Sequence, residues 1–521
     1  MFFINLKELQ LNTCHLILIF REMSGSQKMY EPDYDYYGTG ALCFKLPGRP
    51  FVVASGQESA TIGKVFVARI FEEMYKLGYD FITCSDLTQT LDQGNLFFKK
   101  SRSHPERRNN LVLCVAPGGM DKIILARCPD DVKSAIKDAI SKSWREGIQS
   151  EESERTLGIM ITKLKLNGNP WNSCADESVD CRKLLISIIE NLEKLHWRFH
   201  AIANIKGGTD SLFFMYDPDR PRSGNLSMLS LNRTDRLRLI NFSDGRGLIE
   251  SVAQNLKETN GQIPDRKNYY GSTEFKVSGT PFYSSGYESI ASREMIAGVL
   301  QVLRQNGYEV LTGIDVSRKL HDKSSILFRK CNRSFEQHSC ISLNDVDKIR
   351  IINFPSDTSR ALELCIQQHY LPGIQEIKEK GSRTSCCQLK LNGSPWSSYN
   401  KIYSIHGKSM LMMLLREASR LKWELVASVD VSAKYVHQDN GPDYPIDVHA
   451  WFFKYTRDGK HFLFLLIRDL YKTSFILFVA ILLAIKYKKT FENHFQYNPI
   501  KNRLRQQTNG CHQSLVNLKY P

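Results

Sequence analysis

The tetrapeptide Gly168-Asn169-Pro170-Trp171 sets the plan of this chain, because three similar tetrapeptides stand elsewhere in the sequence. They are Gly48-Arg49-Pro50-Phe51, Gly279-Thr280-Pro281-Phe282 and Gly393-Ser394-Pro395-Trp396. Glycine permits a positive φ and proline offers no N–H to a strand ladder, so each copy predicts a turn that ends a strand. The four turns recur about every 115 residues, and such a repeat predicts four copies of one structural unit.

Each copy shows the same order of predicted elements around this turn. A short alternating run such as Leu164-Lys165-Leu166 predicts the strand before it. After the turn, apolar residues recur at helical spacing, for example over Glu288–Gln305 in the third copy. Four further apolar runs and an Asp-led helix start complete the unit. It therefore reads strand, helix, four strands, helix, an α+β fold with a mainly antiparallel sheet and helices on one face.

The repeat divides the chain into six segments. We expect a disordered leader over 1–37, repeat modules over 38–150, 151–265, 266–380 and 381–485, and a basic tail over 486–521. A unit of this size can bury an ordinary core, so each copy could fold as a domain. Two copies that share one sheet fit the sequence equally well. Residues 1–22 lack the basic segment and cleavage site of a signal peptide, and Met23 is a second candidate start.

The composition indicates a globular protein, with 42% hydrophobic and 24% charged residues. Its thirteen cysteines hold no common register across the four copies. A disulfide framework or a zinc site would recur with the fold, so this pattern predicts free buried thiols in a reducing compartment. We therefore expect the protein in the cytoplasm or the nucleus, with no metal and no cofactor.

The run Phe475–Ile485 admits two interpretations. It is apolar over eleven residues and precedes several lysines, as a membrane-anchoring segment would, but a spanning helix needs roughly 20 residues. In the repeat, Phe462–Ile467 and Phe475–Ala480 fall where the fourth copy should have its fourth and fifth strands. We favour the strands, and a membrane-anchored protein is the alternative.

One basic position recurs in the first turns of the predicted helix, 15 residues before the aromatic residue that opens the second strand. It is occupied by Lys64, Arg182, Arg293 and Lys408. A cation near a helix N-terminus, where free N–H groups already favour negative charge, can form an anion site. The alternative, which we favour, is a solvated or ion-paired position that contributes tenths of a kcal/mol.

A polar position recurs seven residues after the same aromatic residue, at the end of the second strand. It is occupied by Asp86, Asn204, Asp315 and Asp430. Carboxylates at strand ends often belong to active sites. However, a serine or threonine two residues later in three copies favours an Asx-type turn, and Asn204 argues against chemistry common to all copies. Phosphate loops, His-Glu-x-x-His, Cys-x-x-Cys and nucleophile-elbow motifs are missing from the sequence, so we expect no shared catalytic residue.

The fourth copy carries a resemblance. The string Leu391-Asn392-Gly393-Ser394-Pro395-Trp396 and the later stretch 421–430, Leu-Lys-Trp-Glu-Leu-Val-Ala-Ser-Val-Asp, resemble a repeated segment of uncharacterised eukaryotic proteins. The segment 310–320 of the third copy is similar to the same pattern. The resemblance covers most of the chain through its four copies. It implies a family of repeats and brings no activity with it.

Together these patterns favour a non-enzymatic modular binding or scaffold protein whose partner is another protein or an acidic ligand. Linked copies of one surface gain affinity through effective concentration. One alternative is an enzyme with a single competent module. Another is binding to nucleic acid or an anionic membrane, because the net charge is +15 and basic residues cluster at 99–108 and in the tail.

Overall fold

The computed structural model describes most of the chain between residues 57 and 456. The gaps in this range are 88–93, 102–109, 157, 206–208, 220–223, 244–246, 320–321, 381–384, 398–400, 433, 437–443 and 446. The first tetrapeptide, the leader, the segment Phe475–Ile485 with its predicted strands, and the basic tail all lie outside the described residues.

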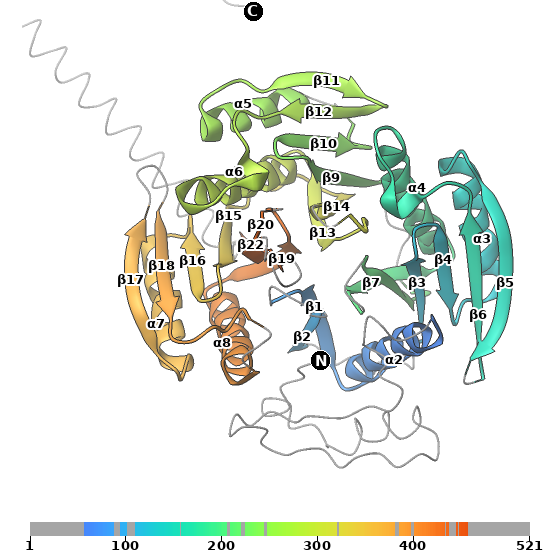
Figure 1. Cartoon of the computed structure of the whole chain (residues 1–521), viewed down its shortest axis with the longest axis horizontal. Helices are drawn as coiled ribbons and strands as arrows, with labels where there is room; N and C mark the ends of the chain where they lie inside the picture. Colours follow the sequence, from blue (N-terminus) through green and yellow to red (C-terminus); the bar gives the residue numbers. More distant parts are fainter. Residues whose placement is uncertain are drawn as a thin grey trace, which may run out of the picture. The chain divides into compact units, whose positions relative to one another are not determined.

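Three six-stranded antiparallel sheets, which we number 2 to 4, form the body of the described chain (Figure 1). Sheet 2 has the order β5 (Ile148–Thr156), β6 (Ile159–Leu166), β4 (Lys122–Ala126), β3 (Val112–Gly118), β8 (Ser211–Tyr216) and β7 (Trp197–Ala203). Its helices are α3 (Asp130–Ser143) and α4 (Glu177–Lys194). The module therefore runs strand, strand, helix, strand, strand, helix, strand, strand along the chain.

Sheets 3 and 4 repeat this topology. Sheet 3 has the order β11 (Asp265–Tyr269), β12 (Ser272–Lys276), β10 (Arg236–Ile240), β9 (Leu226–Asn232), β14 (Ser325–Lys330) and β13 (Tyr308–Ile314), with α5 (Leu248–Asn260) and α6 (Gly286–Gln305). Sheet 4 has the order β17 (Ile374–Lys380), β18 (Cys386–Leu391), β16 (Lys348–Ile352), β15 (His338–Asn344), β22 (Asp447–Tyr455) and β19 (Trp423–Val429), with α7 (Ser356–His369) and α8 (Lys401–Arg420).

The N-terminal part of the described chain corresponds to the second half of a module. Helix α2 (Gln57–Lys76) precedes β1 (Tyr79–Ser85) and β2 (Asn95–Lys100), which pair as the two-stranded sheet 1. The β1–β2 ladder carries an irregularity between Phe81 and Thr83, and the equivalent ladders of sheets 2, 3 and 4 carry one at the same place. A shared bulge position identifies sheet 1 as the same structural unit.

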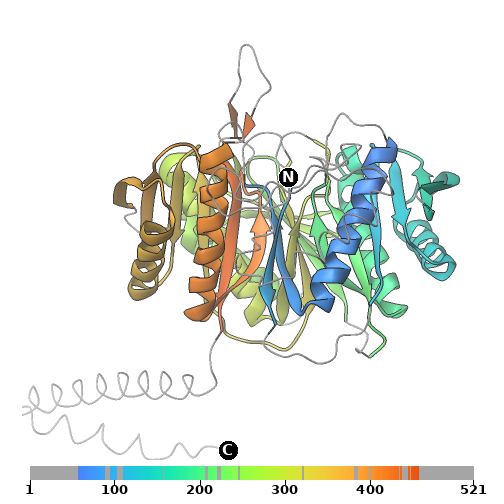
Figure 2. The ribbon, with the colours of Figure 1, turned by 90° about the horizontal axis from the view of Figure 1, so that it is seen from below.

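The innermost strands of the four sheets are β1, β7, β13 and β19, which surround one central point in Figure 1. Strand β1 contacts both β7 and β19, and β13 contacts β19. A short hairpin of β20 (Tyr435–Val436) and β21 (Tyr444–Pro445) projects at one end of the sheets, as Figure 2 shows.

The α+β class and the repeated antiparallel plan are as the sequence predicts, but the sheets follow a different frame. The predicted module boundaries at 150, 265 and 380 fall in or at the ends of β5, β11 and β17, which are the outer strands of the sheets. The predicted unit also lacked these three strands. Their sequences are largely charged and exposed, as in the Lys-Glu alternation of β17, so hydrophobic alternation does not reveal them.

The tetrapeptide turns have one geometry in the three described copies. Gly168, Gly279 and Gly393 have φ of 72°, 73° and 73°, a region that glycine adopts without strain. The following aromatic residues Trp171, Phe282 and Trp396 are fully buried. The indole N–H of Trp171 donates to the carbonyl of Lys122 at 2.7 Å, and that of Trp396 donates to Lys348 at 2.9 Å. The turn therefore ties the strand before each helix to the neighbouring hairpin.

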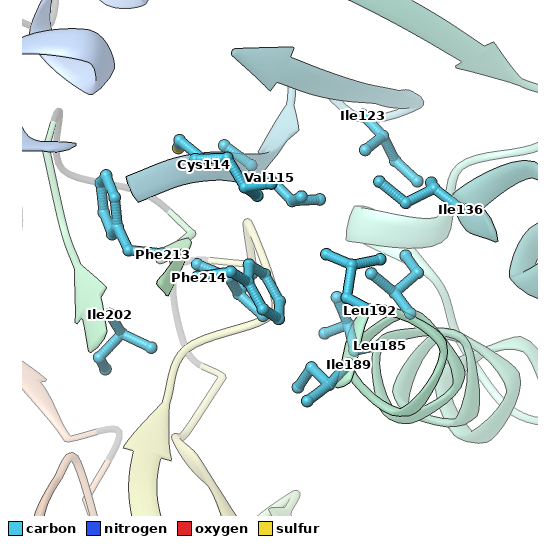
Figure 3. Close-up of a cluster of buried hydrophobic side chains, with 14 of the residues drawn as sticks. Cys114, Val115, Ile123, Ile136, Leu185, Ile189, Leu192, Ile202, Phe213 and Phe214 are labelled. Atoms are coloured by element: carbon cyan, nitrogen blue, oxygen red, sulfur yellow. The ribbon is translucent and has the colours of Figure 1, made fainter. Parts of the chain in front are cut away.

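The core of each module lies between its sheet and its helices. Figure 3 shows this layer in the first complete module, where Phe214 of β8 faces Leu185 and Ile189 of α4. Phe213 lies on the other face of β8 and packs against Phe71 of α2, with ring centroids 5.0 Å apart. Eight of the ten described cysteines are buried, and all ten are free thiols. Burial raises the pKa of Cys114 to about 12, so that thiol packs as a small apolar group. In the described part of the chain, no helix combines the length and apolarity that a membrane span requires.

Substitutions at Trp171 test the role of the buried turn. The third copy carries Phe282 at the same position, so Trp171→Phe should keep the packing and lose one hydrogen bond, a cost of about 1–2 kcal/mol. Trp171→Ala should leave a cavity and cost about 3–5 kcal/mol. Urea unfolding of both variants measures the difference, and equal losses would contradict the packing role.

Candidate functional site

Four polar strand ends meet where the sheets adjoin. The strand-end residues are Asp86, Asn204, Asp315 and Asp430, which follow β1, β7, β13 and β19. Each one bonds to a residue at the start of the second innermost strand of a neighbouring sheet; Gly94, Asp210 and Ser324 directly precede that strand, and His449 is the third residue of β22. We call each of these contacts a joint and name it by the two sheets it connects. The eight residues together form the central polar cluster.

The joint between sheets 2 and 3 consists of two reciprocal hydrogen bonds. The backbone N–H of Asp210 donates to the carbonyl of Asp315 at 2.9 Å. The backbone N–H of Asp315 donates to Oδ2 of Asp210 at 2.7 Å. The side chain of Asp210 therefore accepts the last amide of the neighbouring inner strand.

The joint between sheets 3 and 4 repeats this exchange with a hydroxyl. Ser324 N–H donates to the carbonyl of Asp430 at 3.2 Å, and Asp430 N–H donates to Oγ of Ser324 at 2.9 Å. At the joint between sheets 4 and 1, His449 N–H donates to the carbonyl of Asp86, and Asp86 N–H donates to Nδ1 of His449, both at 3.4 Å.

The joint between sheets 1 and 2 has glycine in the corresponding place. Gly94 N–H donates to the carbonyl of Asn204 at 2.8 Å. The side-chain amide of Asn204 donates through Nδ2 to Oδ2 of Asp86 at 3.0 Å. The four joints therefore connect sheet 1 to 2, 2 to 3, 3 to 4 and 4 back to 1, so the central polar cluster closes a circuit.

The strand-end carboxylates also order their own loops. Oδ1 of Asp315 accepts the N–H of Ser317, and Oδ1 of Asp430 accepts the N–H of Ser432, each at 3.1 Å. These are Asx-type bonds, in which an aspartate holds the backbone two residues further on. Beyond Asp315, the N–H of Arg318 donates to the carbonyl of Trp171, so the loop reaches the tetrapeptide turn of the preceding module.

Of the four acidic side chains in the cluster, Asp210 is buried, and Asp86, Asp315 and Asp430 are half-buried. The pKa of Asp210 is raised to about 8, mainly by burial; the hydrogen bond from the Asp315 backbone N–H opposes this rise, and the negative charge of Asp86 adds to it. Burial and the charge of Asp210 hold the pKa of Asp315 well above its usual range. Asp430 is raised only to about 6, because His449 and Lys323 oppose the effect of burial on its pKa.

The joints bring backbones close together, which restricts the residues beside them. A Cβ on Gly313 would lie 2.2 Å from the carbonyl oxygen of Ser428 on the neighbouring inner strand. A Cβ on Gly94 would lie 2.1 Å from Sγ of Cys84 and 3.1 Å from the backbone of Asn204. Glycine is therefore required by close packing at both positions.

The recurring basic residues lie in the same region and are all buried. Arg182 donates through Nε to Oγ of Ser325 at 3.1 Å and lies 3.7 Å from Oδ2 of Asp322. Arg293, on the next module's helix, donates to Oδ2 of Asp447 at 3.0 Å and is fully buried. Each arginine connects a helix of one module to a strand or loop of the next. Both arginines are therefore buried and ion-paired, and neither is solvated.

Lys64 on α2 and Lys408 on α8 occupy the matching helical positions and are also buried. The structure does not bring the four cations to a single place, because each one lies on the helix of a different module.

A second set of bridging residues was missed by the sequence reasoning. Arg238 on β10 donates to Oε2 of Glu274 at 2.7 Å and to Oγ of Ser178 on the preceding module's helix at 3.1 Å. Arg350 on β16 donates to Gln388 at 2.9 Å and to Ser289 at 2.7 Å in the same way. An arginine that alternates with apolar residues along a strand is expected to face solvent, so the alternation alone does not indicate a bridging role. The matched strings Arg-Leu-Arg-Leu-Ile (236–240) and Lys-Ile-Arg-Ile-Ile (348–352) were the available signal.

The joint between sheets 4 and 1 contains a buried hydroxyl network. Ser428 donates to Oγ of Ser85 at 2.8 Å and lies 2.9 Å from Nδ1 of His449. The indole N–H of Trp451 donates to the same Ser85 oxygen at 3.0 Å. Because both serines are buried and fully engaged, this network stabilises the joint. Within the described residues, no three His, Cys, Asp or Glu side chains are placed to hold a metal ion.

These observations define a class of protein, an α+β protein built from tandem modules that are connected by polar joints. A family model described only as a domain matches residues 112–215, 225–329 and 337–454, which is more than half of the chain. The chain therefore belongs to this family. Each match spans one six-stranded sheet from its first to its last strand in sequence, so the family repeat follows the sheets. Neither the curated proteins nor the solved structures compared with the chain give a match.

Replacing Gly313 by alanine tests the close approach at the joint between sheets 3 and 4. The added methyl group would collide with the Ser428 carbonyl, so we expect a loss of about 1–3 kcal/mol in unfolding free energy. Gly224 has open space around it and an ordinary φ, so Gly224→Ala is the matched control and should change stability by less than about 0.5 kcal/mol. Indistinguishable denaturation midpoints would contradict the packing argument.

Substitution of Arg293 tests the buried ion pair between modules. Arg293→Met leaves the carboxylate of Asp447 buried without its cation, so a loss of about 3–5 kcal/mol is expected. The double variant Arg293→Met with Asp447→Asn should recover part of this loss. Arg293→Lys should cost less, because lysine occupies this position in two copies. A double-mutant cycle in urea measures the coupling, and additive losses would show that the pair contributes nothing.

Proposed function

We propose that this protein is a non-enzymatic scaffold that binds a protein partner through equivalent surfaces on successive modules. The observation that carries the proposal is a set of exposed apolar side chains at corresponding turns. Met120 and Val346 occupy the same position in the hairpins β3–β4 and β15–β16 and are 52% and 37% exposed. Ile263 and Leu371 lie in the turns before β11 and β17 and are 70% and 76% exposed.

Strand register puts these turns at one end of the sheets. In sheet 2, Ala203 at the end of β7 pairs with Ser211 at the start of β8, and Leu212 of β8 pairs with Val115 of β3. Strand β3 then continues to Gly118, which pairs with Lys122 across the β3–β4 turn. The turn that contains Met120 is therefore at the same end as the central polar cluster. The pairs of sheets 3 and 4 run in the same way, so the turns that contain Ile263, Val346 and Leu371 share this end of their sheets.

The distribution of polar residues supports binding over catalysis. The recurring strand-end residues exchange hydrogen bonds across the joints, and Arg182 and Arg293 bridge modules. These contacts give the modules fixed partners within the chain. Each of the two kinds of turn carries an exposed apolar side chain in two of the three complete modules. Such side chains are suited to weak contacts of similar chemistry, and linked weak contacts gain affinity through effective concentration.

The experiment compares two sets of surface variants on the whole chain. One set replaces Met120, Val346, Ile263 and Leu371 by glutamate, singly and together. The control set replaces Leu111, Met160 and Tyr270, exposed residues at the opposite end of the sheets, by glutamate. Proteins enriched on the wild-type chain and quantified by mass spectrometry identify the partner, and titration of that purified partner gives its dissociation constant.

We expect each single variant to weaken binding a few-fold and the combined variant to weaken it more than tenfold, because contacts in a multivalent interface act together. The control set should bind as the wild type does. A partner whose affinity is unchanged by the combined variant would contradict the proposed surface. Denaturation curves within about 0.5 kcal/mol of the wild type would establish that all variants are folded.

A further inference from the structure

We propose that the joint between sheets 2 and 3 is a proton-dependent latch, closed while its two carboxyl groups are protonated and weakened when both are ionised. The two groups belong to Asp210 and Asp315. This joint differs from the others in having a carboxyl side chain on both sides of the reciprocal hydrogen bonds. The other joints have Gly94, Ser324 and His449 at the place of Asp210.

The geometry links the carboxyl groups directly to the closed joint. Oδ2 of Asp210 accepts the N–H of Asp315 at 2.7 Å, and Oδ1 of Asp315 accepts the N–H of Ser317 at 3.1 Å. Asp210 is only 7% exposed. Opening the joint would release both carboxyl groups to water, where ionisation is far less costly.

The charges that act on this pair from the packed elements are mainly negative. Asp86 at the end of β1 acts on Asp210, while Asp322 and Asp430 act on Asp315. The nearby cations among the described residues act on other carboxylates. Lys323 and His449 act on Asp430, and Arg182 lies 3.7 Å from Asp322. Asp210 is buried and Asp315 is half-buried. Because like charges repel each other at such sites, the closed joint favours the protonated forms.

The sign of the pH dependence follows from these raised pKa values. Asp210 titrates at about 8 in the closed joint, against 3.8 for an ordinary aspartate, and Asp315 is raised as well. The stabilisation from the protonated carboxyl is therefore complete below about pH 4. It is lost progressively as the pH rises toward 8. The latch is tight in acid and opens more often at neutral and alkaline pH.

Hydrogen exchange measured by mass spectrometry on the full chain tests the proposal. Protection factors, corrected for the intrinsic pH dependence of exchange, are compared between pH 5 and 9 for peptides that contain Asp210 and Asp315. We expect protection at this joint to fall with rising pH by up to about tenfold per unit for each ionising carboxyl. Peptides at Gly94 serve as the internal reference, because that residue contributes no titratable side chain.

The chain itself suggests the variants. Asp210→Ser introduces the residue found at the joint between sheets 3 and 4, and Asp315→Asn introduces the residue found after β7. Both keep a hydrogen-bond acceptor and remove a titratable group, so both should reduce the pH slope. The reverse variant, Ser324→Asp, should add a slope at the joint between sheets 3 and 4.

Two results would overturn the latch. One is a wild-type protein in which protection falls with pH equally at all four joints, which requires no variant to be folded. The other is an unchanged slope in folded Asp210→Ser and Asp315→Asn proteins. A slope that disappears in both variants and appears in Ser324→Asp establishes the carboxyl pair as the titrating element.

Discussion

The hydrogen bond that satisfies the last amide of three of the four inner strands governs how the modules fit together. A strand that ends at a buried edge leaves its final N–H without a ladder partner, and a buried N–H without an acceptor is costly. At three joints the acceptor is a side chain of the neighbouring sheet, supplied by Asp210, Ser324 or His449. The returning backbone bond fixes the spacing, so each sheet is positioned by the sheet beside it.

This spacing explains residues that are not themselves polar. At these joints the chain comes so close to its neighbours that Gly313, beside Ser428, and Gly94, beside Cys84 and Asn204, have no room for a methyl group. The buried arginines form a second set of contacts between modules. Arg182 and Arg293 each extend from the helix of one module and donate a hydrogen bond to a strand residue of the next. A buried cation requires a fixed partner, so these pairs add a second constraint on the same arrangement.

The sequence predicts the parts of this fold that depend on neighbouring residues. The tetrapeptide turn, the helix at Gly286–Gln305 and the alternating strands follow from local sterics and hydrophobic period. Which strands share a sheet does not follow from local sequence. The two strands that join the halves of a sheet, such as β3 and β8, are nearly a whole repeat apart in the chain. Outer strands such as β17 are charged on both faces, and no periodic signal distinguishes them from loops.

The central polar cluster illustrates the same division at the level of single residues. Comparison of the copies finds Asp86, Asn204, Asp315 and Asp430, because they share a register. Their hydrogen-bond partners belong to a different copy of the repeat and vary from glycine to aspartate, serine and histidine, so internal comparison hides them. The bond from the backbone N–H of each partner to the strand-end carbonyl tolerates this variation, because it involves no side chain. The four joints therefore share one backbone contact but differ in their side chains, and only some of them contain a titratable group, although the repeat makes all four look alike.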